Sequence, residues 1–389
     1  MEQDNRYRWL VLAVGTAAQT SVSGVFLGIA VLAPQLRAQY HLSLGQIGIL
    51  LAATSIGMTP TLLPWGLLAD RVGERIVLPV GLAASAVVLA PTGFVPDYGE
   101  LVGLLVAAGA FGASVNAASG RAVMQWFPKS QRGLALGIRQ SNVPIGGLLA
   151  ALLLPPLASR SGVGGAFLAL AIAAGVGAGA GALLLRDPSG PRPVEPLRSR
   201  PLRDPAVWRL SGASGLLLVG QTATMSFSVL FLHAARHLSP GSAARVLAAQ
   251  QVLGLALRVL AGHASDRRQA RVALMRRLAV AIGLTLCLVA ALAHSSTWVL
   301  VPVLVVTGGV GLSWNGLSFT VAAEIAGAQA SGAAIGLQQT VLGIGGIVVP
   351  IGFSAIVAAS SWPAAFAAAA AFPLVGWAVL RPLEQVGRY

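Results

Sequence analysis

The chain has 389 residues, of which 56% are hydrophobic and only 10% carry a charge, and its mean hydropathy is +0.77. Soluble domains carry about 25% charged residues, so this composition excludes a soluble globular protein and indicates a polytopic membrane protein. The net charge of +14 raises nucleic-acid binding as an alternative. The placement of the basic residues in loops between apolar segments argues against it.

Twelve apolar segments, each near the ~20 residues that a membrane-spanning helix needs, lie between Trp9 and Leu380. No small-residue cleavage site follows the first, so we expect it to remain as an uncleaved span. After the sixth, the stretch RDPSGPRPVEPLRSRPLRD is too rich in Pro and Arg to lie in lipid. We therefore predict an all-α membrane protein with an N-terminal six-helix bundle (1–185), a cytoplasmic linker (186–204) and a C-terminal six-helix bundle (205–389).

Most of the 26 Lys and Arg residues fall in loops and tails on the side of the N-terminus. Cytoplasmic loops carry such an excess, so both termini and the linker are predicted to be cytoplasmic, in a bacterial inner membrane. The basic balance is then a topology signal. Gly and Ala are abundant in the spans, which predicts close helix packing where lipid offers no hydrophobic drive.

The loop after the second span, Gly66–Arg75, reads GLLADRVGER, and Gly262–Arg268 echoes it as GHASDRR after the eighth. This G-x-x-x-D-R-x-G-x-R pattern resembles the signature loop of the major facilitator superfamily, and the twelve spans and central linker extend the resemblance over the whole chain. The resemblance implies a transporter that works by alternating access, with this loop at the inner gate. The alternative is a merely solvated turn.

Each gating residue has an expected role by the same resemblance. Gly66 allows close packing, and Asp70 faces a helix end in the other bundle, where the helix dipole favours a carboxylate. Arg71 and Arg75 pair locally. The full set of expected gating residues is Gly66, Asp70, Arg71, Gly73, Arg75, Arg258, Gly262, Asp266 and Arg267.

A long stretch of the chain is written twice, since Leu312–Gly346 repeats Ala113–Gly147. The copies share Asn116 with Asn315 and Gln140 with Gln339, and paired amides inside apolar runs are hard to attribute to composition alone. Such a repeat predicts two similar halves. In transporters, substrate sites lie near the midplane at the interface between repeats.

Three arginines, Arg121, Arg139 and Arg258, fall inside spans, where a charge is costly and faces a cavity or a partner. Guanidinium groups suit bidentate capture of carboxylate or phosphate. Glu324, at the inner end of the tenth span, is the one carboxylate near the membrane and is a candidate for proton coupling. The alternative makes these arginines gate struts that pair with Glu324 or with helix-end carbonyls.

The predicted substrate-binding set combines these arginines with amides and one indole in the spans. Its members are Gln19, Asn116, Arg121, Arg139, Asn142, Gln221, Trp314, Asn315, Gln338 and Gln339. Amides in an apolar span need partners, and positions on spans one, four, seven and ten line the central cavity by family resemblance.

The preferred function is therefore secondary transport of a small organic or inorganic anion, coupled to protons, by a monomer without cofactor or metal. Efflux of a drug-like compound by proton antiport is the first alternative. The sequence Val143-Pro144-Ile145-Gly146-Gly147 departs from the G-P-x-x-G-G pattern of antiporters in the family, which weakens that reading. A transport-inactive sensor with the same fold is the second. The sequence contains no HExxH or CxxC metal cluster, no Walker loop and no dinucleotide fingerprint, so we expect neither an enzyme nor ATP as the energy source.

Overall fold

The computed structural model describes residues 2–127, 131–186, 203–268, 270–327 and 331–384. The chain forms two compact units, Met1–Pro191 and Arg192–Tyr389. The boundary between them falls within the stretch predicted to be the linker. Throughout the described ranges the regular structure is helical, without strands, as predicted.

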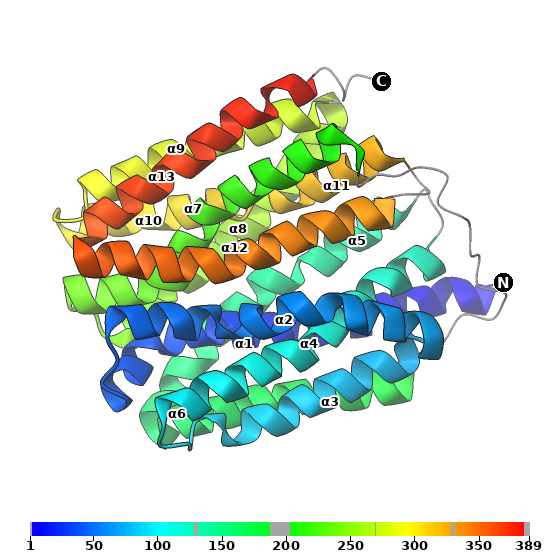
Figure 1. Cartoon of the computed structure of the whole chain (residues 1–389), viewed down its shortest axis with the longest axis horizontal. Coiled ribbons are helices and arrows are strands. Elements are labelled where there is room, and N and C mark those ends of the chain that lie inside the picture. Colours follow the sequence, from blue (N-terminus) through cyan, green and yellow to red (C-terminus); the bar gives the residue numbers. More distant parts are fainter. Residues whose placement is uncertain (1, 128–130, 187–202, 269, 328–330, 385–389) are drawn as a thin grey trace. The chain divides into compact units, whose positions relative to one another are not determined.

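Unit 1 consists of helices that run alongside one another in the blue to green part of Figure 1. They are α1 (Glu2–Gln39), α2 (Leu44–Val72), α3 (Glu74–Thr92), α4 (Tyr98–Trp126), α5 (Arg132–Gln140) and α6 (Asn142–Leu184).

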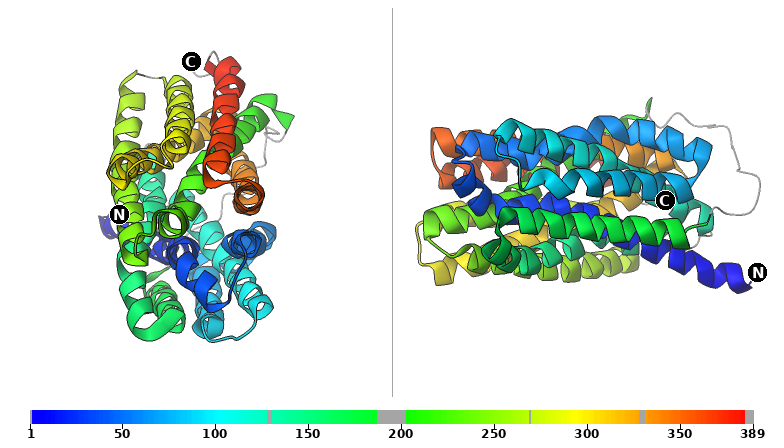
Figure 2. Two further views of the ribbon diagram at one scale, coloured as in Figure 1. Left: turned by 90° about the vertical axis from the view of Figure 1, so that its left-hand side faces the viewer. Right: turned by 90° about the horizontal axis from the view of Figure 1, so that it is seen from below.

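Unit 2 repeats this arrangement with different interruptions. Its elements are α7 (Pro205–Arg236), α8 (Pro240–Arg268), α9 (Arg271–Ala291), α10 (Thr297–Gly311), α11 (Asn315–Ala326), α12 (Ser331–Ala359), α13 (Trp362–Leu380) and the short 3₁₀ helix η3 (Arg381–Glu384). Figure 2 shows the helices of unit 2, coloured green to red, from two further sides.

Eleven helices in the described ranges are long and apolar enough to cross a membrane. One of them, α6, has 43 residues and a break at Gly162, where φ is 68° and ψ is 180°. This backbone conformation is open almost only to glycine, so the chain turns here and α6 supplies two crossings. The prediction of twelve spans is thereby confirmed.

The pairs of helices that pack together correspond between the units. In unit 1, α2 packs on α4, α3 packs on α4 and α6, and α1 packs on α6. In unit 2, α8 packs on α10, α9 packs on α10 and α13, and α7 packs on α12 and α13. In this correspondence, α10 and α11 together take the place of α4. Helices α12 and α13 take the places of the two arms of α6. The predicted pseudo-symmetry is confirmed at this level.

Small residues bring neighbouring helices into contact in unit 1. A methyl group added at Gly57 of α2 would lie 1.8 Å from the carbonyl oxygen of Val106 in α4, and one at Gly109 of α4 would lie 2.0 Å from that of Thr54. The two glycines therefore let the backbones of α2 and α4 touch, as expected where small residues set helix spacing in a membrane.

Unit 2 also contains an aromatic cluster between α7, α12 and α13. Phe227, Phe231, Phe353, Trp362 and Phe366 form it, with ring centroids 4.5–6.4 Å apart. These distances match the range in which aromatic pairs stabilise a core.

The predicted gating loop joins α2 to α3 with almost no residues between the helices. Gly73 ends α2 and begins α3, is buried, and has φ 88° and ψ 164°, a conformation that other residues adopt only with strain. Asp70, Arg71 and Arg75 are exposed. Within unit 1, a methyl group added at Gly66 would meet no described atom within 4 Å, so the close packing expected of this residue stays a prediction.

Candidate functional site

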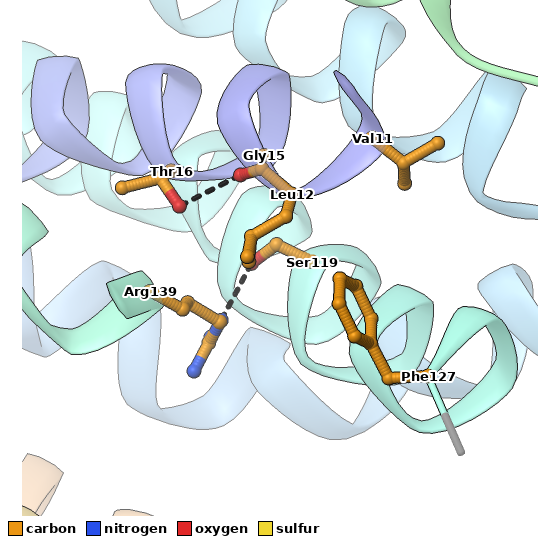
Figure 3. A pocket seen from close by; sticks show the side chains of 7 residues that line it. All are labelled: Val11, Leu12, Gly15, Thr16, Ser119, Phe127 and Arg139. Atoms are coloured by element: carbon orange, nitrogen blue, oxygen red, sulfur yellow. Dashed lines mark hydrogen bonds between the residues drawn. The ribbon is translucent and has the colours of Figure 1, made fainter. Parts of the chain in front are cut away.

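Arg139 is the penultimate residue of α5, two residues before the short interruption at Ser141 that separates α5 from α6. Its side chain is only 5% exposed. The Nε group donates a hydrogen bond to Ser119 Oγ over 3.0 Å, and Nη2 donates one to the carbonyl oxygen of Asn116 over 3.1 Å. The guanidinium is thus fixed against α4, and Figure 3 shows it reaching toward Ser119.

Amide residues of α1, α4 and α6 are linked to Arg139 by hydrogen bonds, directly or through one another. Gln19 Nε2 donates to Asn116 Oδ1 over 2.6 Å. Asn142 Nδ2 donates to the carbonyl oxygen of Arg139 over 2.6 Å, and its Oδ1 accepts a hydrogen bond from Ser23. The structure therefore brings four predicted binding residues into one connected network: Gln19, Asn116, Arg139 and Asn142.

The charge of Arg139 is not balanced by a carboxylate in the described part of the chain, since both of its partners there are neutral oxygen atoms. A buried charge without an ionic partner is costly in a membrane protein. An anion that reached the guanidinium would offset that cost. This arrangement suits the binding of an anion rather than that of a cation.

A small cavity adjoins Arg139 inside unit 1. Its volume is about 10 Å³, which is room for one water molecule at most. The lining, shown in Figure 3, consists of Val11, Leu12, Gly15, Thr16, Ser119, Phe127 and Arg139. Val11, Leu12 and Phe127 are apolar, and the guanidinium and the hydroxyl groups of Thr16 and Ser119 supply the polar part of the lining.

Unit 2 has an amide at the position that corresponds to Arg139. Gln338 of α12 is fully buried, and its Nε2 donates to Ser214 Oγ over 2.9 Å and to Ser318 Oγ. Ser318 is the repeat counterpart of Ser119. The two units therefore use the same serine to hold different side chains, one cationic and one neutral.

Arg258 of α8 lies at a second helix interruption, between α10 and α11. Its Nε and Nη2 donate to the carbonyl oxygen of Leu312 over 3.1 and 2.9 Å, and Nη2 also donates to Asn315 Oδ1 over 3.2 Å. A cation suits this place because the last carbonyls of a helix carry partial negative charge. Arg258, a predicted gating residue, thus contacts Asn315, a predicted substrate-binding residue, and both roles stay predictions.

The family follows from the whole chain rather than from these residues alone. The sequence model of the Major Facilitator Superfamily matches residues 12–350. The chain belongs to the major facilitator superfamily. The members of this family are generally transporters rather than enzymes, so the prediction of a multi-pass membrane transporter is confirmed.

Two relatives and one solved structure give further comparisons. An uncharacterised MFS-type transporter of Mycobacterium tuberculosis is 32% identical over 371 residues, which cover 94% of this chain and 83% of that protein. The galacturonate transporter of Dickeya chrysanthemi is 31% identical over 153 residues, 39% of this chain and 42% of that protein. A bacterial homologue of the human lysosomal transporter Spinster, in its inward-facing and unoccupied conformation, matches with a TM-score of 0.74 at 18% identity, covering 98% of each chain.

The remaining predicted residues of this transporter are more scattered. Gln221 and Trp314 are buried, and their Oε1 and Nε1 atoms have no hydrogen-bond partner among the described residues. Gln339 is half-buried on α12. The side chains of Arg121 and Asp266 lie outside the part that the structure describes.

The expected gating and coupling residues of unit 2 lie near the ends of its helices. Gly262 is half-buried, and Arg267 is exposed. Glu324, on α11, forms an ion pair of 2.6 Å with Arg271 at the start of α9, and its side chain is 47% exposed. This contact corresponds to the strut that the sequence left open as the alternative to proton coupling.

Sequence reasoning missed the serines that orient the site. Ser119 and Ser318 are identical in the two copies of the repeat, and each is fully or almost fully buried. That identity was a usable signal. We considered the charged and amide residues and so left out the serines that position them.

Proposed function

We propose that this protein is a secondary transporter for small organic anions and that Arg139 is the group that binds the anionic part of the substrate. The observation that carries the proposal is the buried guanidinium of Arg139 with neutral partners among the described residues. Charge-assisted hydrogen bonds from a guanidinium to a carboxylate or sulfonate are among the strong polar contacts in proteins.

The amide network supports the same assignment. Gln19, Asn116 and Asn142 hold both the side chain and the backbone of Arg139 in place, so little freedom is lost when an anion binds. The partial relative named as a galacturonate transporter carries a sugar with one carboxylate. A sugar acid is therefore the first substrate class to test.

The mechanism that we propose is alternating access by two bundles, residues 1–185 and 205–389, joined by the linker 186–204. We place the protein as a monomer in a bacterial inner membrane with both termini in the cytoplasm. We assign coupling to protons to Glu324, the half-exposed carboxylate of α11 that forms an ion pair with Arg271.

A matched pair of sugars tests the substrate class. Purified full-length protein in proteoliposomes is given labelled galacturonate or galactose, which differ by a carboxylate in place of a hydroxymethyl group. We expect uptake of the acid, or of another small carboxylate or sulfonate in a wider panel, and none of the neutral sugar. Uptake of neutral or cationic compounds alone would overturn the proposal, and no transport of any compound would favour the sensor alternative.

The coupling ion is tested in the same vesicles. An inward proton gradient should accelerate uptake of the anion, and a protonophore should abolish the acceleration. The Glu324→Gln variant should keep binding but lose the response to the gradient. Equal rates with and without the gradient in the wild-type protein would remove proton coupling from the proposal while leaving anion transport in place.

A further inference from the structure

Unit 2 carries a second cavity, far along the chain from Arg139 and its network. It has a volume of about 350 Å³ and lies where the first turns of α9 meet the end of α13 and η3. The lining residues are Ala273, Arg276, Arg277, Val280, Trp377 and Glu384. Two guanidiniums and one carboxylate leave this cavity with a net positive charge.

Arg276 is held rigidly in the wall of the cavity. Its Nη1 forms an ion pair of 2.5 Å with Glu384, and its Nε donates to the carbonyl oxygen of Trp377 over 3.2 Å. The guanidinium also lies 5.1 Å from the centre of the Trp377 ring, within the range of a cation–π contact. These contacts use Arg276 to fasten α9 to α13 and neutralise Glu384.

Arg277 is the second cation of the cavity and takes no part in these contacts. Its side chain is exposed and lines the cavity, and no residue in the described part of the chain gives it a hydrogen bond or an ion pair. Its guanidinium can therefore donate to a guest. A phosphodiester group, with one negative charge and two acceptor oxygens, is complementary to it.

An apolar face continues from the cavity along α9. Arg277, Val280, Leu284 and Leu288 follow one another at spacings of three and four residues, which places them on one side of the helix. Leu284 and Leu288 are 60% and 45% exposed. From Arg277 to Leu288 this face extends roughly 16 Å at the rise of an α-helix, about half of the ~30 Å hydrocarbon core.

Trp377 indicates the level in the membrane at which the cavity lies. Its side chain is 42% exposed beside the two arginines, and tryptophan is enriched at the level of the lipid headgroups. The cavity thus combines an interfacial ring, a free guanidinium and an apolar face one leaflet long. A soluble anion would use only the guanidinium, whereas a phospholipid would use all three.

We propose that this cavity between α9 and α13 binds the headgroup of an anionic phospholipid, with Arg277 donating to its phosphodiester and an acyl chain lying along Val280, Leu284 and Leu288. Basic pockets between helices at a membrane surface are suited to such headgroups. The bound lipid would fasten α9 to α13 from outside and stabilise unit 2. The site is independent of the anion-transport proposal and of Arg139.

Thermal unfolding of the full-length protein in a neutral detergent tests the assignment. Short-chain phosphatidylglycerol, short-chain phosphatidylcholine and glycerol phosphate are titrated separately, because a ligand of the native state raises the Tm. We expect phosphatidylglycerol to raise the Tm and the other two compounds to have little effect. The Arg277→Gln variant should bind phosphatidylglycerol about tenfold more weakly, as expected for one lost hydrogen bond to a charged group.

The matched control is Arg160→Gln, which removes the same charge from an exposed residue of unit 1. It should keep the wild-type response to phosphatidylglycerol. Equal losses in the two variants would show that overall charge, not this cavity, attracts the lipid and would overturn the proposal. An equal response to phosphatidylcholine would also overturn it, and an equal response to glycerol phosphate would reassign the cavity to a soluble anion.

Discussion

The two units share the same helix packing but place different side chains beside one shared position of the repeat. Ser119 in unit 1 and Ser318 in unit 2 occupy the same position of the repeat, and each accepts a hydrogen bond from the helix that follows. The donor is Arg139 in unit 1 and Gln338 in unit 2. The fold therefore tolerates a neutral side chain at this position, so the charge of Arg139 is better explained by a ligand than by stability.

The half-buried Arg258 of unit 2 gives the opposite result. Arg258 of unit 2 corresponds to Leu62 in unit 1 when the loop motif and its echo are aligned. Arg258 donates to the carbonyl oxygen of Leu312 at the interruption between α10 and α11, whereas α4 in unit 1 runs without interruption. Here the arginine accompanies a local difference in backbone structure, which points to a structural role.

The largest expected effect comes from making unit 1 resemble unit 2. In the Arg139→Gln variant the amide can keep the hydrogen bond to Ser119, as Gln338 does with Ser318, so we expect little change in the Tm. Loss of the charge should weaken anion binding about 100-fold, because removing one partner of a buried charge pair costs about 2–5 kcal/mol. Calorimetric titration with the transported anion measures this.

The reciprocal Gln338→Arg variant sharpens the result. It places a guanidinium beside Ser318 and should not restore anion binding to the Arg139→Gln protein, because the amides around Arg139 come from unit 1. If Arg139→Gln lowers the Tm strongly and leaves binding intact, Arg139 is a structural residue and the two units are equivalent at this site.

The next largest effect is expected at Gly73, between the second and third helices of unit 1. Gly73→Ala forces a side chain into a conformation with φ 88° and should cost about 2 kcal/mol of unfolding free energy. Gly66→Ala in the same loop is the matched control. It should be neutral or slightly stabilising, since alanine is the better helix former and no neighbour is close. Denaturant titration compares the two variants.

A smaller effect is expected from Arg258→Leu, which copies Leu62 of unit 1. Two hydrogen bonds to Leu312 and one to Asn315 disappear, and polar contacts within membranes average about 0.6 kcal/mol each, so stability should fall by roughly 1–2 kcal/mol. Anion affinity should remain at its wild-type value. A loss of affinity larger than the loss of stability would instead move Arg258 into the binding site.

The smallest effect is expected from the two serines. Ser119→Ala removes the acceptor that orients Arg139 and should weaken anion binding about two- to fivefold, within the range of one neutral hydrogen bond. Ser318→Ala should leave binding unchanged. Identical effects of the two substitutions on affinity would contradict the view that the anion binds through unit 1.

Much of the fold could be predicted from the sequence, because span length and apolar content are properties of short segments. The repeat predicted two similar units because its matching residues can be read directly from the sequence. The partner of Arg258 could not be predicted, since it is the backbone carbonyl of Leu312 at an interruption that no Pro marks. Likewise, no local pattern shows that Arg139 turns toward Ser119, which depends on how α4 and α5 are rotated about their axes.

The short helix α11 is fastened at both ends by an arginine from a neighbouring helix. Arg258 of α8 holds Asn315 at its start, and Arg271 of α9 holds Glu324 near its finish. The ion pair between Arg271 and Glu324 is half-exposed, so it contributes less than about 1 kcal/mol to stability. Breaking this ion pair would release only the last part of α11, because Ser318, in the first half of the helix, stays bonded to Gln338 of α12.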